Sequence, residues 1–383
     1  MAKRTTSKTT ETAQPAAKRA TATKAPAAKT APKAPAKATA SRPRKAPAAQ
    51  PASKPAQPFN ILIVAHQGRL AYEALIFTAS LRANAPDFKG RLIVAEPRAE
   101  GRWSGHEVAI PDPIRKQLES MGAEITPFTA HHFGAEYPNG NKIEALAALP
   151  SGQPFIFFDT DTIITGPLDQ VPFDFDRPSA SMKREGTWPE APLYGPTITD
   201  IWKSLYDRFG LDFDSSLDKT QPDEHWERYL YFNAGWFFGA DPEAFGKRYS
   251  EWAQAVRNHP GEVLAAQNLY PWLDQIVLPL VIHSFGGGRP GPELAGLDGD
   301  VTLHYRMLPL FYALAPQKAL DTLEALAEDK SIRRLLRDWE PAKKLILQGK
   351  GLKKLRPLFE GQPLPRREMP IRQKIKANKL WLV

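Results

Sequence analysis

Short apolar runs separated by polar turns set the pattern of the chain from about Phe59 onward. Three of these runs, at 60–65, 91–95 and 155–158, are almost wholly aliphatic or aromatic and end in polar or turn-forming residues. Runs of this length and composition are typical of strands buried on both faces of a sheet. A helix predicted at 72–81 completes a strand–helix–strand unit, which implies parallel strands and an α/β fold.

The same pattern predicts further elements downstream. We expect helices at 112–122, at 142–149 and from Trp272 onward, and strands at 123–128, 229–239 and 301–305. The residues between 170 and 230 are rich in Pro, Trp and Asp and predict an irregular, loop-rich region. Beyond residue 316 the chain is expected to be helical, and then basic and interrupted by prolines.

Two carboxylates, Asp159 and Asp161, follow directly on the run at 155–158. Because side chains alternate along a strand, both point to the same side where the strand leaves the sheet. Carboxylates so placed repel each other unless a cation lies between them, and their oxygens suit Mg²⁺ or Mn²⁺ shared with a phosphate. The pair therefore indicates one of three things: the metal-diphosphate site of a sugar-nucleotide transferase, the nucleophile and acid of a haloacid-dehalogenase-type phosphatase, or two solvated strand-end residues.

Other polar residues fall near the ends of predicted strands. Ligands of open α/β sheets bind at the carboxyl ends of strands, so the turn at 66–72 and the acid pair are expected to line one edge. Lys142 precedes the acid-bearing strand and is either a surface residue or a phosphate contact. In the aromatic run at 229–239, a buried Asn233 would need a hydrogen-bond partner, and Gly235 permits close approach of a ligand or of backbone.

Composition excludes several classes of site. The chain has no cysteine, which removes disulfides, thiolate zinc sites and cysteine nucleophiles. No apolar segment follows the charges at the N-terminus as in a secretory signal, and no run of about eighteen apolar residues suggests a membrane span. We therefore expect a cytoplasmic protein, with the inner face of the membrane as a possible place of peripheral attachment.

The net charge of +9 comes from an N-terminal tail. Residues 1–57 carry 13 basic residues and one acidic residue, which leaves 38 basic and 41 acidic residues in the remainder. The tail has no aromatic residue and is predicted to be disordered, because it cannot bury enough surface to offset the entropy of ordering. It is either a solvated extension or an attachment to nucleic acid, anionic membrane or another polyanion. The expected organisation is thus a tail at 1–57, an α/β domain at 58–315 and a basic helical extension at 316–383.

The order of these pieces resembles the GT-A glycosyltransferases, most nearly glycosyltransferase family eight and related bacterial enzymes. The resemblance runs from about Asn60 to Tyr305 and begins with the strand at 60–65. Four further segments match motifs of that family: the Asp-x-Asp strand Phe157-Phe-Asp159-Thr-Asp161-Thr, the Asn-x-Gly segment Phe232-Asn233-Ala-Gly235, the Asp-Gln segment Leu273-Asp274-Gln275, and the late histidine in Leu303-His304-Tyr305.

The resemblance implies a GT-A-like, mixed and mostly parallel sheet flanked by helices. It also implies Mn²⁺ or Mg²⁺ held by Asp159, Asp161 and His304, bridging the two phosphates of a nucleoside-diphosphate sugar, with a UDP-sugar as the favoured donor. The metal would neutralise charge on the leaving diphosphate. The implied enzyme is a retaining hexosyltransferase with a glycan, lipid or protein acceptor.

By the same analogy, Asn233 and Asp274 or Gln275 would contact the donor sugar or the acceptor, and these are the candidate catalytic residues. His66, Gln67 and Tyr72 would border the nucleotide, with Tyr72 stacking on the base. Lys142 would add a second cation beside the diphosphate.

Two departures from the family pattern bear on this site. The Lys-Pro-Trp sequence that usually follows the late histidine is absent, and Arg306 is the candidate to replace its lysine. His283, which precedes Ser-Phe-Gly-Gly-Gly288, is a rival to His304 as the third metal ligand.

Two other functions remain open at this point. The phosphatase alternative is disfavoured because Ile163 stands where that motif has Thr or Val, about 100 residues of predicted fold precede the motif, and no second acid follows Asp300 at helical spacing. The other alternative is a nucleic-acid-associated binding protein that acts through its tail and carries an inert α/β domain.

Overall fold

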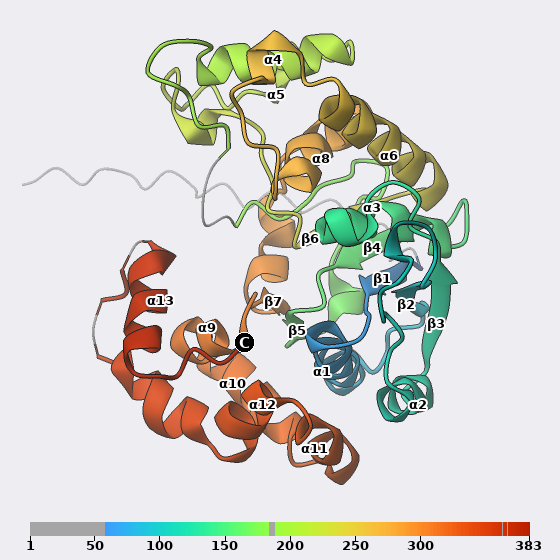
Figure 1. Cartoon of the computed structure of the whole chain (residues 1–383), viewed down its shortest axis with the longest axis vertical. Helices are drawn as coiled ribbons and strands as arrows, with labels where there is room; N and C mark the ends of the chain where they lie inside the picture. Colours follow the sequence, from blue (N-terminus) through green and yellow to red (C-terminus); the bar gives the residue numbers. More distant parts are fainter. Residues whose placement is uncertain (1–57, 184–187, 362, 366) are drawn as a thin grey trace, which may run out of the picture. The chain divides into compact units, whose positions relative to one another are not determined.

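Five strands form the central sheet of this computed structural model, which describes residues 58–183, 188–361, 363–365 and 367–383 (Figure 1). Their order in the sheet is β3 (Ala123–Phe128), β2 (Leu92–Pro97), β1 (Asn60–Val64), β4 (Phe155–Phe158) and β6 (Trp236–Gly239). The first four are parallel, and β6 runs antiparallel to β4. The predicted mixed, mostly parallel sheet is therefore confirmed.

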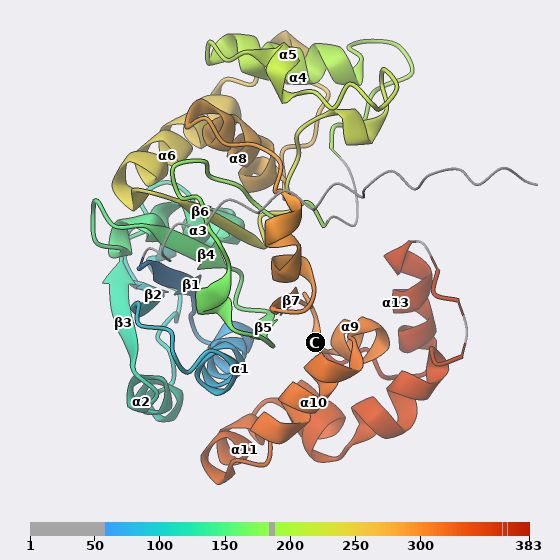
Figure 2. The ribbon, with the colours of Figure 1, turned by 180° about the vertical axis from the view of Figure 1, so that it is seen from behind.

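Side chains on the two faces of the sheet belong to two separate apolar cores. Ile61 and Ile63 of β1 belong to one core, whereas Leu62 and Val64 belong to the other. Helices α1 (Arg69–Asn84) and α2 (Asp112–Ser120) cover the first face, and α3 (Asn141–Glu144), α6 (Pro242–Asn258) and α8 (Leu273–Ser284) cover the second (Figures 1 and 2). The inner strands β1 and β4 are buried along their whole length and almost wholly apolar, because both faces of the sheet are covered there.

The chain reverses its direction of travel through the sheet beside β1. It passes from β1 to β2 and β3 on one side, and then returns to place β4 on the other side of β1. The carboxyl ends of β1 and β4 therefore flank a topological switch point, which is where open α/β sheets bind ligands.

A second, two-stranded sheet lies just beyond the end of β4. Strand β5 (Thr162–Ile164) pairs antiparallel with β7 (Thr302–His304), and Thr162 lies opposite His304. Helix α1 holds β5 through two side chains: the backbone N–H of Ile164 donates to the Ser80 hydroxyl at 3.0 Å, and the Asn84 amide donates to the carbonyl of Ile164 at 3.1 Å.

The predicted strand at 229–239 is too long. Strand β6 begins only at Trp236, and the residues before it are buried without belonging to a strand. Ala234 has a positive φ of 56°, which no strand accommodates. The aromatic character of 229–235 reflects packing in the second core, beneath α8, and not pairing in the sheet.

The region at 170–230 is also more ordered than predicted, because it contains α4 (Ile198–Arg208) and α5 (Phe213–Ser216). Helix α4 begins at a capping box in which Thr197 and Asp200 satisfy each other's backbone N–H groups. Its buried residues Ile201, Trp202, Leu205 and Tyr206 recur at helical spacing.

The helical C-terminal region is confirmed. Its α-helices are α9 (Leu308–Leu314), α10 (Gln317–Leu326), α11 (Lys330–Leu336), α12 (Glu340–Ala342) and α13 (Glu368–Ala377). One further α-helix, α7 (Gly261–Leu264), lies between α6 and α8 in the sequence. Apolar residues of these C-terminal helices join the core beneath α1. In the part of the chain that the structure describes, no helix is long and apolar enough to span a membrane. The predicted tail at 1–57 lies outside the described residues, and the domain boundaries stay predictions.

Candidate functional site

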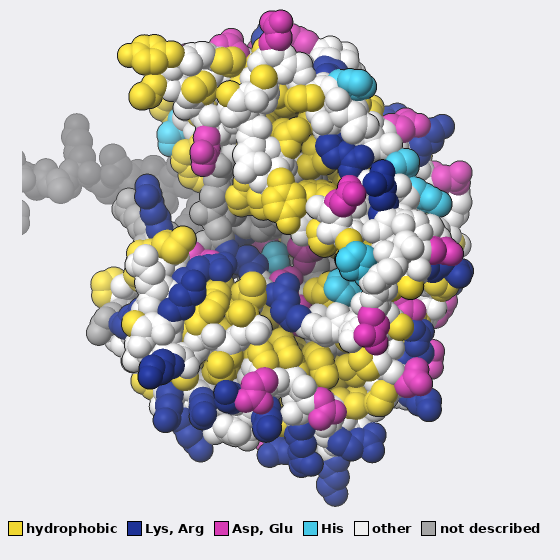
Figure 3. All heavy atoms as spheres, viewed as in Figure 1, with side chains coloured by type: hydrophobic (Ala, Val, Ile, Leu, Met, Phe, Trp, Pro, Cys, Tyr) yellow, Lys and Arg dark blue, Asp and Glu magenta, His cyan; other side chains and the backbone are white. Residues whose placement is uncertain are grey.

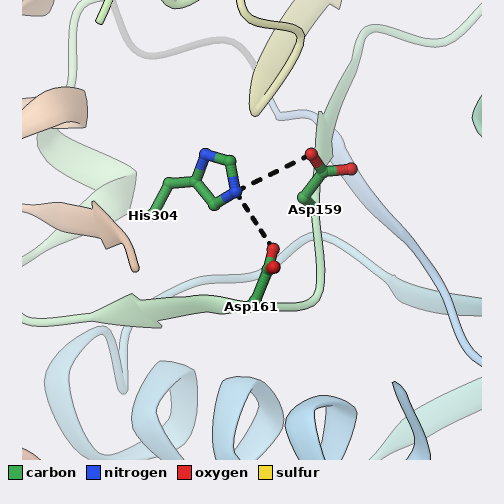
Figure 4. Close-up of side chains that lie close together, drawn as sticks. All are labelled: Asp159, Asp161 and His304. Carbon is green, nitrogen blue, oxygen red and sulfur yellow. Dashed lines mark ion pairs between the residues drawn. The ribbon is translucent and has the colours of Figure 1, made fainter. Parts of the chain in front are cut away.

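Asp159, Asp161 and His304 converge beyond the end of β4 (Figure 4). His304 Nε2 lies 3.1 Å from Oδ1 of Asp161 and 3.8 Å from Oδ2 of Asp159. Each of the three residues offers one potential ligand atom, and these three atoms all lie within 4.8 Å of one another. The three residues come from two segments far apart in the sequence, which β5 and β7 bring together.

Gly235 lies beside both Asp159 and His304. The N–H of Asp159 donates to the carbonyl of Gly235 at 2.9 Å. A Cβ on Gly235 would lie 2.3 Å from Nδ1 of His304, so only glycine at this position leaves room for the imidazole. Gly235 therefore leaves space for the histidine that faces the acid pair.

The charges of the site favour a divalent cation. Asp159 and Asp161 lie beside Arg69 and Lys142, and these two cations also pair with the buried acids Glu73 and Asp274. Burial and the nearby Asp161 raise the pKa of Glu73 well above its usual range, which favours the neutral form of that acid. A cation between Asp159 and Asp161 would relieve the repulsion between these two carboxylates. Two carboxylates and an imidazole are suitable ligands for Mn²⁺ and, with water, for Mg²⁺, so the residues present fit the metal.

Asp161 and His304 shift each other's pKa in opposite directions. Burial lowers the pKa of His304, but the carboxylates of Asp161 and Asp159 together outweigh burial, and the net shift of the His304 pKa is upward. Burial raises the pKa of Asp161, whereas His304 and Arg69 lower it, and the net shift is downward. The imidazolium and the carboxylate therefore stabilise each other.

Lys142 lies between two acids on the other side of Asp159. Its Nζ is 2.9 Å from Oδ1 of Asp159 and 3.3 Å from Oδ2 of Asp274, and it donates to the carbonyl of Ala234 at 3.2 Å. Burial would lower the pKa of Lys142, but the two carboxylates more than offset burial and raise it. Asp274 is 1% exposed and accepts a 2.6 Å hydrogen bond from the hydroxyl of Tyr137.

A cavity of about 380 Å³ opens beside the acid pair, lined in part by His66, Arg69, Lys142, Asp159 and Asp161. The space-filling view shows acidic, basic and histidine side chains gathered in a hollow on this face (Figure 3). A second cavity of about 210 Å³, lined in part by Asn233, Asp298 and Arg306, lies against His304.

Two other predicted site residues line these cavities, His66 the larger one and Asn233 the smaller one. His66 lines the larger cavity and packs against Trp103, with ring centroids 5.5 Å apart. Gln67 follows His66 in the turn after β1, and its N–H donates to the carbonyl of Val108. Asn233 accepts from the N–H of Gly235 at 2.7 Å, and Gln275 accepts from the Tyr231 hydroxyl at 2.9 Å.

Three predicted residues have partners outside the acid–histidine group. Tyr72 stacks on Trp339 with centroids 5.6 Å apart. The Arg306 guanidinium pairs with Glu368 of α13. His283 lies at the far end of α8, 3.2 Å from the Ser215 hydroxyl, and is not part of the acid–histidine group found in the described residues. His304 is therefore the histidine placed to complete a metal site.

A family model for the Rhodobacterales glycosyltransferase domain matches residues 61–286, which is more than half of the chain. The chain belongs to this glycosyltransferase family. The match includes the acid pair, Lys142, Asn233, Asp274 and Gln275, and it ends before His304. Membership confirms the predicted glycosyltransferase identity and decides against the phosphatase alternative.

Solved glycosyltransferase structures are similar at low identity. One is the galactosyltransferase LgtC in complex with donor and acceptor sugar analogues (15% identity, 63% of this chain and 78% of that chain, TM-score 0.35). Another is GlyE of Streptococcus pneumoniae (11% identity, 75% of this chain and 65% of that chain, TM-score 0.38). No curated protein matches the sequence.

The sequence analysis did not identify Arg69 and Glu73 as parts of this site. Glu73 is 0% exposed, and its ion-pair partner Arg69 also contacts Asp161. The signal was a single acid within the apolar helix Leu-Ala-Tyr-Glu-Ala-Leu-Ile-Phe, one helical turn after a basic residue.

Proposed function

We propose that this glycosyltransferase transfers a sugar from a nucleoside-diphosphate sugar to an acceptor and depends on a divalent metal ion. The observation that carries the proposal is the group formed by Asp159, Asp161 and His304 at the switch point of the sheet, beside a cavity of about 380 Å³. Mn²⁺ or Mg²⁺ held there would act as a Lewis acid on the departing diphosphate.

The residues around the acid pair suggest how the donor is held. Arg69 and Lys142 line the cavity and would attract the anionic diphosphate, while His66 borders the space proposed for the nucleoside. Lys142 holds Asp159 in place by an ion pair of 2.9 Å.

We place the sugar of the donor next to Lys142 and Asp274. Asp274 is fixed by Tyr137 and Lys142. Asn233 and Gln275 are the proposed polar contacts to the sugar or the acceptor. A UDP-sugar as donor, a hexosyl group and retention of the anomeric configuration are part of this proposal and follow from the resemblance to family eight.

A turnover assay tests the proposal. We expect release of nucleoside diphosphate from one sugar nucleotide in a panel of UDP- and GDP-sugars, in the presence of Mn²⁺ and not of EDTA. Asp159→Asn and Asp161→Asn are each expected to abolish the release. Release of inorganic phosphate from a phosphate ester, with no turnover of any sugar nucleotide, would contradict it. NMR of the first anomer formed tests the retaining outcome.

A further inference from the structure

Arg69, the first residue of α1, connects three parts of the chain. Its Nε lies 3.4 Å from Oε2 of Glu73, one turn along the helix, and its Nη2 lies 3.6 Å from Oδ2 of Asp161. Its Nη1 donates to the backbone carbonyl of Arg306 at 2.8 Å and lies 3.1 Å from the sulfur of Met307. One guanidinium thus joins the helix, the acid-bearing segment and the segment that follows His304.

Glu73 is an unusual residue for its position. It is 0% exposed in a helix whose neighbouring residues Ala71, Ala74 and Leu75 are also fully buried. Neither of its carboxylate oxygens has a hydrogen-bond partner among the described residues. Burying a carboxylate without hydrogen bonds is costly, and an apolar residue would serve packing better. The contact with Arg69 is the interaction that Glu73 makes and an apolar residue could not make.

The two segments joined by Arg69 meet in a small sheet. Strands β5 and β7 are three residues long each, and the N–H of Tyr305 donates to the carbonyl of Asp161 at 2.8 Å, which extends their pairing. Helix α1 supports β5 through two hydrogen bonds, so the positions of Asp161 and His304 depend on contacts from α1 as well as on this sheet. Arg69 contacts Asp161 directly and holds the carbonyl two residues after His304.

We propose that Arg69, held by Glu73, is a positioning residue that fixes Asp161 and the His304 segment in the arrangement that binds the metal ion. This inference rests on the proposed metal-dependent function. Arginine has five N–H donors in a rigid plane and contacts several directions at once, whereas lysine carries the same charge on one flexible atom. The geometry therefore requires the planar guanidinium of arginine, with its several N–H donors, and not its charge alone.

The test compares Arg69→Lys with Arg82→Lys in the full chain. Arg82 is a matched control because it lies on the same helix and donates to two other carbonyls, Met121 at 2.7 Å and Gly122 at 2.9 Å. Binding of Mn²⁺ is measured by electron paramagnetic resonance without nucleotide, and thermal unfolding is measured without metal. We expect Mn²⁺ affinity to fall roughly 10- to 100-fold in Arg69→Lys and to stay within about twofold in the control.

A second variant, Glu73→Leu, removes the acid while keeping a buried helix-forming residue. It is expected to weaken Mn²⁺ binding in the same direction, because Arg69 loses the partner of its Nε. Unchanged Mn²⁺ affinity in both variants, with only a lower melting temperature, would show a merely structural pair and overturn the inference.

The same measurements separate two further outcomes. Unchanged Mn²⁺ affinity together with weaker nucleotide binding in Arg69→Lys would leave Arg69 only its proposed role at the diphosphate and would overturn the positioning role. Wild-type protein that binds no Mn²⁺, or binds it equally well without Asp159 and Asp161, would instead contradict the proposed function itself.

Discussion

The α-carbon of Gly235 and the imidazole of His304 lie so close that a side chain at Gly235 would occupy the space of the ring. A Cβ there would stand 2.3 Å from Nδ1 and 3.0 Å from Cε1 of His304. Gly235 lies directly before β6, whereas His304 ends β7. The relationship explains why a glycine is needed next to the proposed metal ligand His304, which is 69 positions away in the sequence.

Gly235→Ala is expected to displace His304 and to weaken Mn²⁺ binding by roughly tenfold or more, a loss typical of disturbed groups around a metal site. Calorimetric titration of Mn²⁺ provides the measurement. Gly288→Ala is the matched control, because a Cβ at Gly288 would meet nothing within 4 Å. Equal affinities in the two variants would show that His304 is not a ligand.

Lys142→Met is expected to destabilise the protein by about 3 kcal/mol, because it leaves Asp274, which is buried, without its cation. Denaturant unfolding measures the free energy of unfolding. Lys203→Met removes an exposed pair with Asp207 and is expected to cost less than about 1 kcal/mol. Adding Asp274→Asn to Lys142→Met should recover part of the loss, and no recovery would show that the buried charge is not its cause.

Tyr137→Phe is expected to reduce sugar transfer roughly 10- to 100-fold while leaving Mn²⁺-dependent nucleotide binding unchanged. The reason is that the Tyr137 hydroxyl donates to Asp274 at 2.6 Å and accepts from its N–H at 3.0 Å, which fixes the residue proposed to face the sugar. Turnover and nucleotide titration are measured side by side. Tyr72→Phe, whose ring stacks on Trp339, serves as the control. A parallel loss of nucleotide affinity would place Tyr137 outside the sugar subsite.

Stability is expected to fall at alkaline pH in part through Tyr206. Burial raises its pKa to about 12, and the side chain is 1% exposed. Because the folded state favours the neutral phenol, this contribution is fully present below pH 10 and is lost as the pH rises toward 12. The total is about 3 kcal/mol, since one pKa unit corresponds to about 1.4 kcal/mol.

Comparing the unfolding free energies of wild type and Tyr206→Phe across pH 8–12 isolates this effect from the other buried tyrosines. The variant should lose less stability above pH 10 than wild type does. Identical pH profiles would contradict the effect of burial.

Much of the sheet and the acid pair could be predicted from the sequence because they depend on local patterns. The run at 155–158 is apolar on both sides, so its strand and the two acids after it follow from composition and alternation alone. The aromatic run at 229–235 misled the prediction, because burial under α8 selects the same residues as a strand does. The capping box of α4 was a local signal that the prediction overlooked.

The connections between site residues depend on tertiary structure and could not be read from spacing. Lys142 was predicted as a phosphate contact, but its pairing with both Asp159 and Asp274 appears only when α3, β4 and α8 meet. Arg306, expected at the diphosphate, lines the cavity against His304 and pairs with Glu368 of α13, a contact that no sequence spacing indicates. The pairing of β7 with β5 places His304, and not His283, beside the acids.

The most direct test of a metal-dependent donor site is calorimetric titration of UDP and GDP, with and without Mn²⁺, into wild-type protein and the Asp159→Ala/Asp161→Ala variant. We predict that wild type binds one of these nucleotides only when Mn²⁺ is present, and that the variant does not bind it. No binding of either nucleotide to wild type under any condition, or binding that survives loss of both carboxylates, would contradict the proposed site.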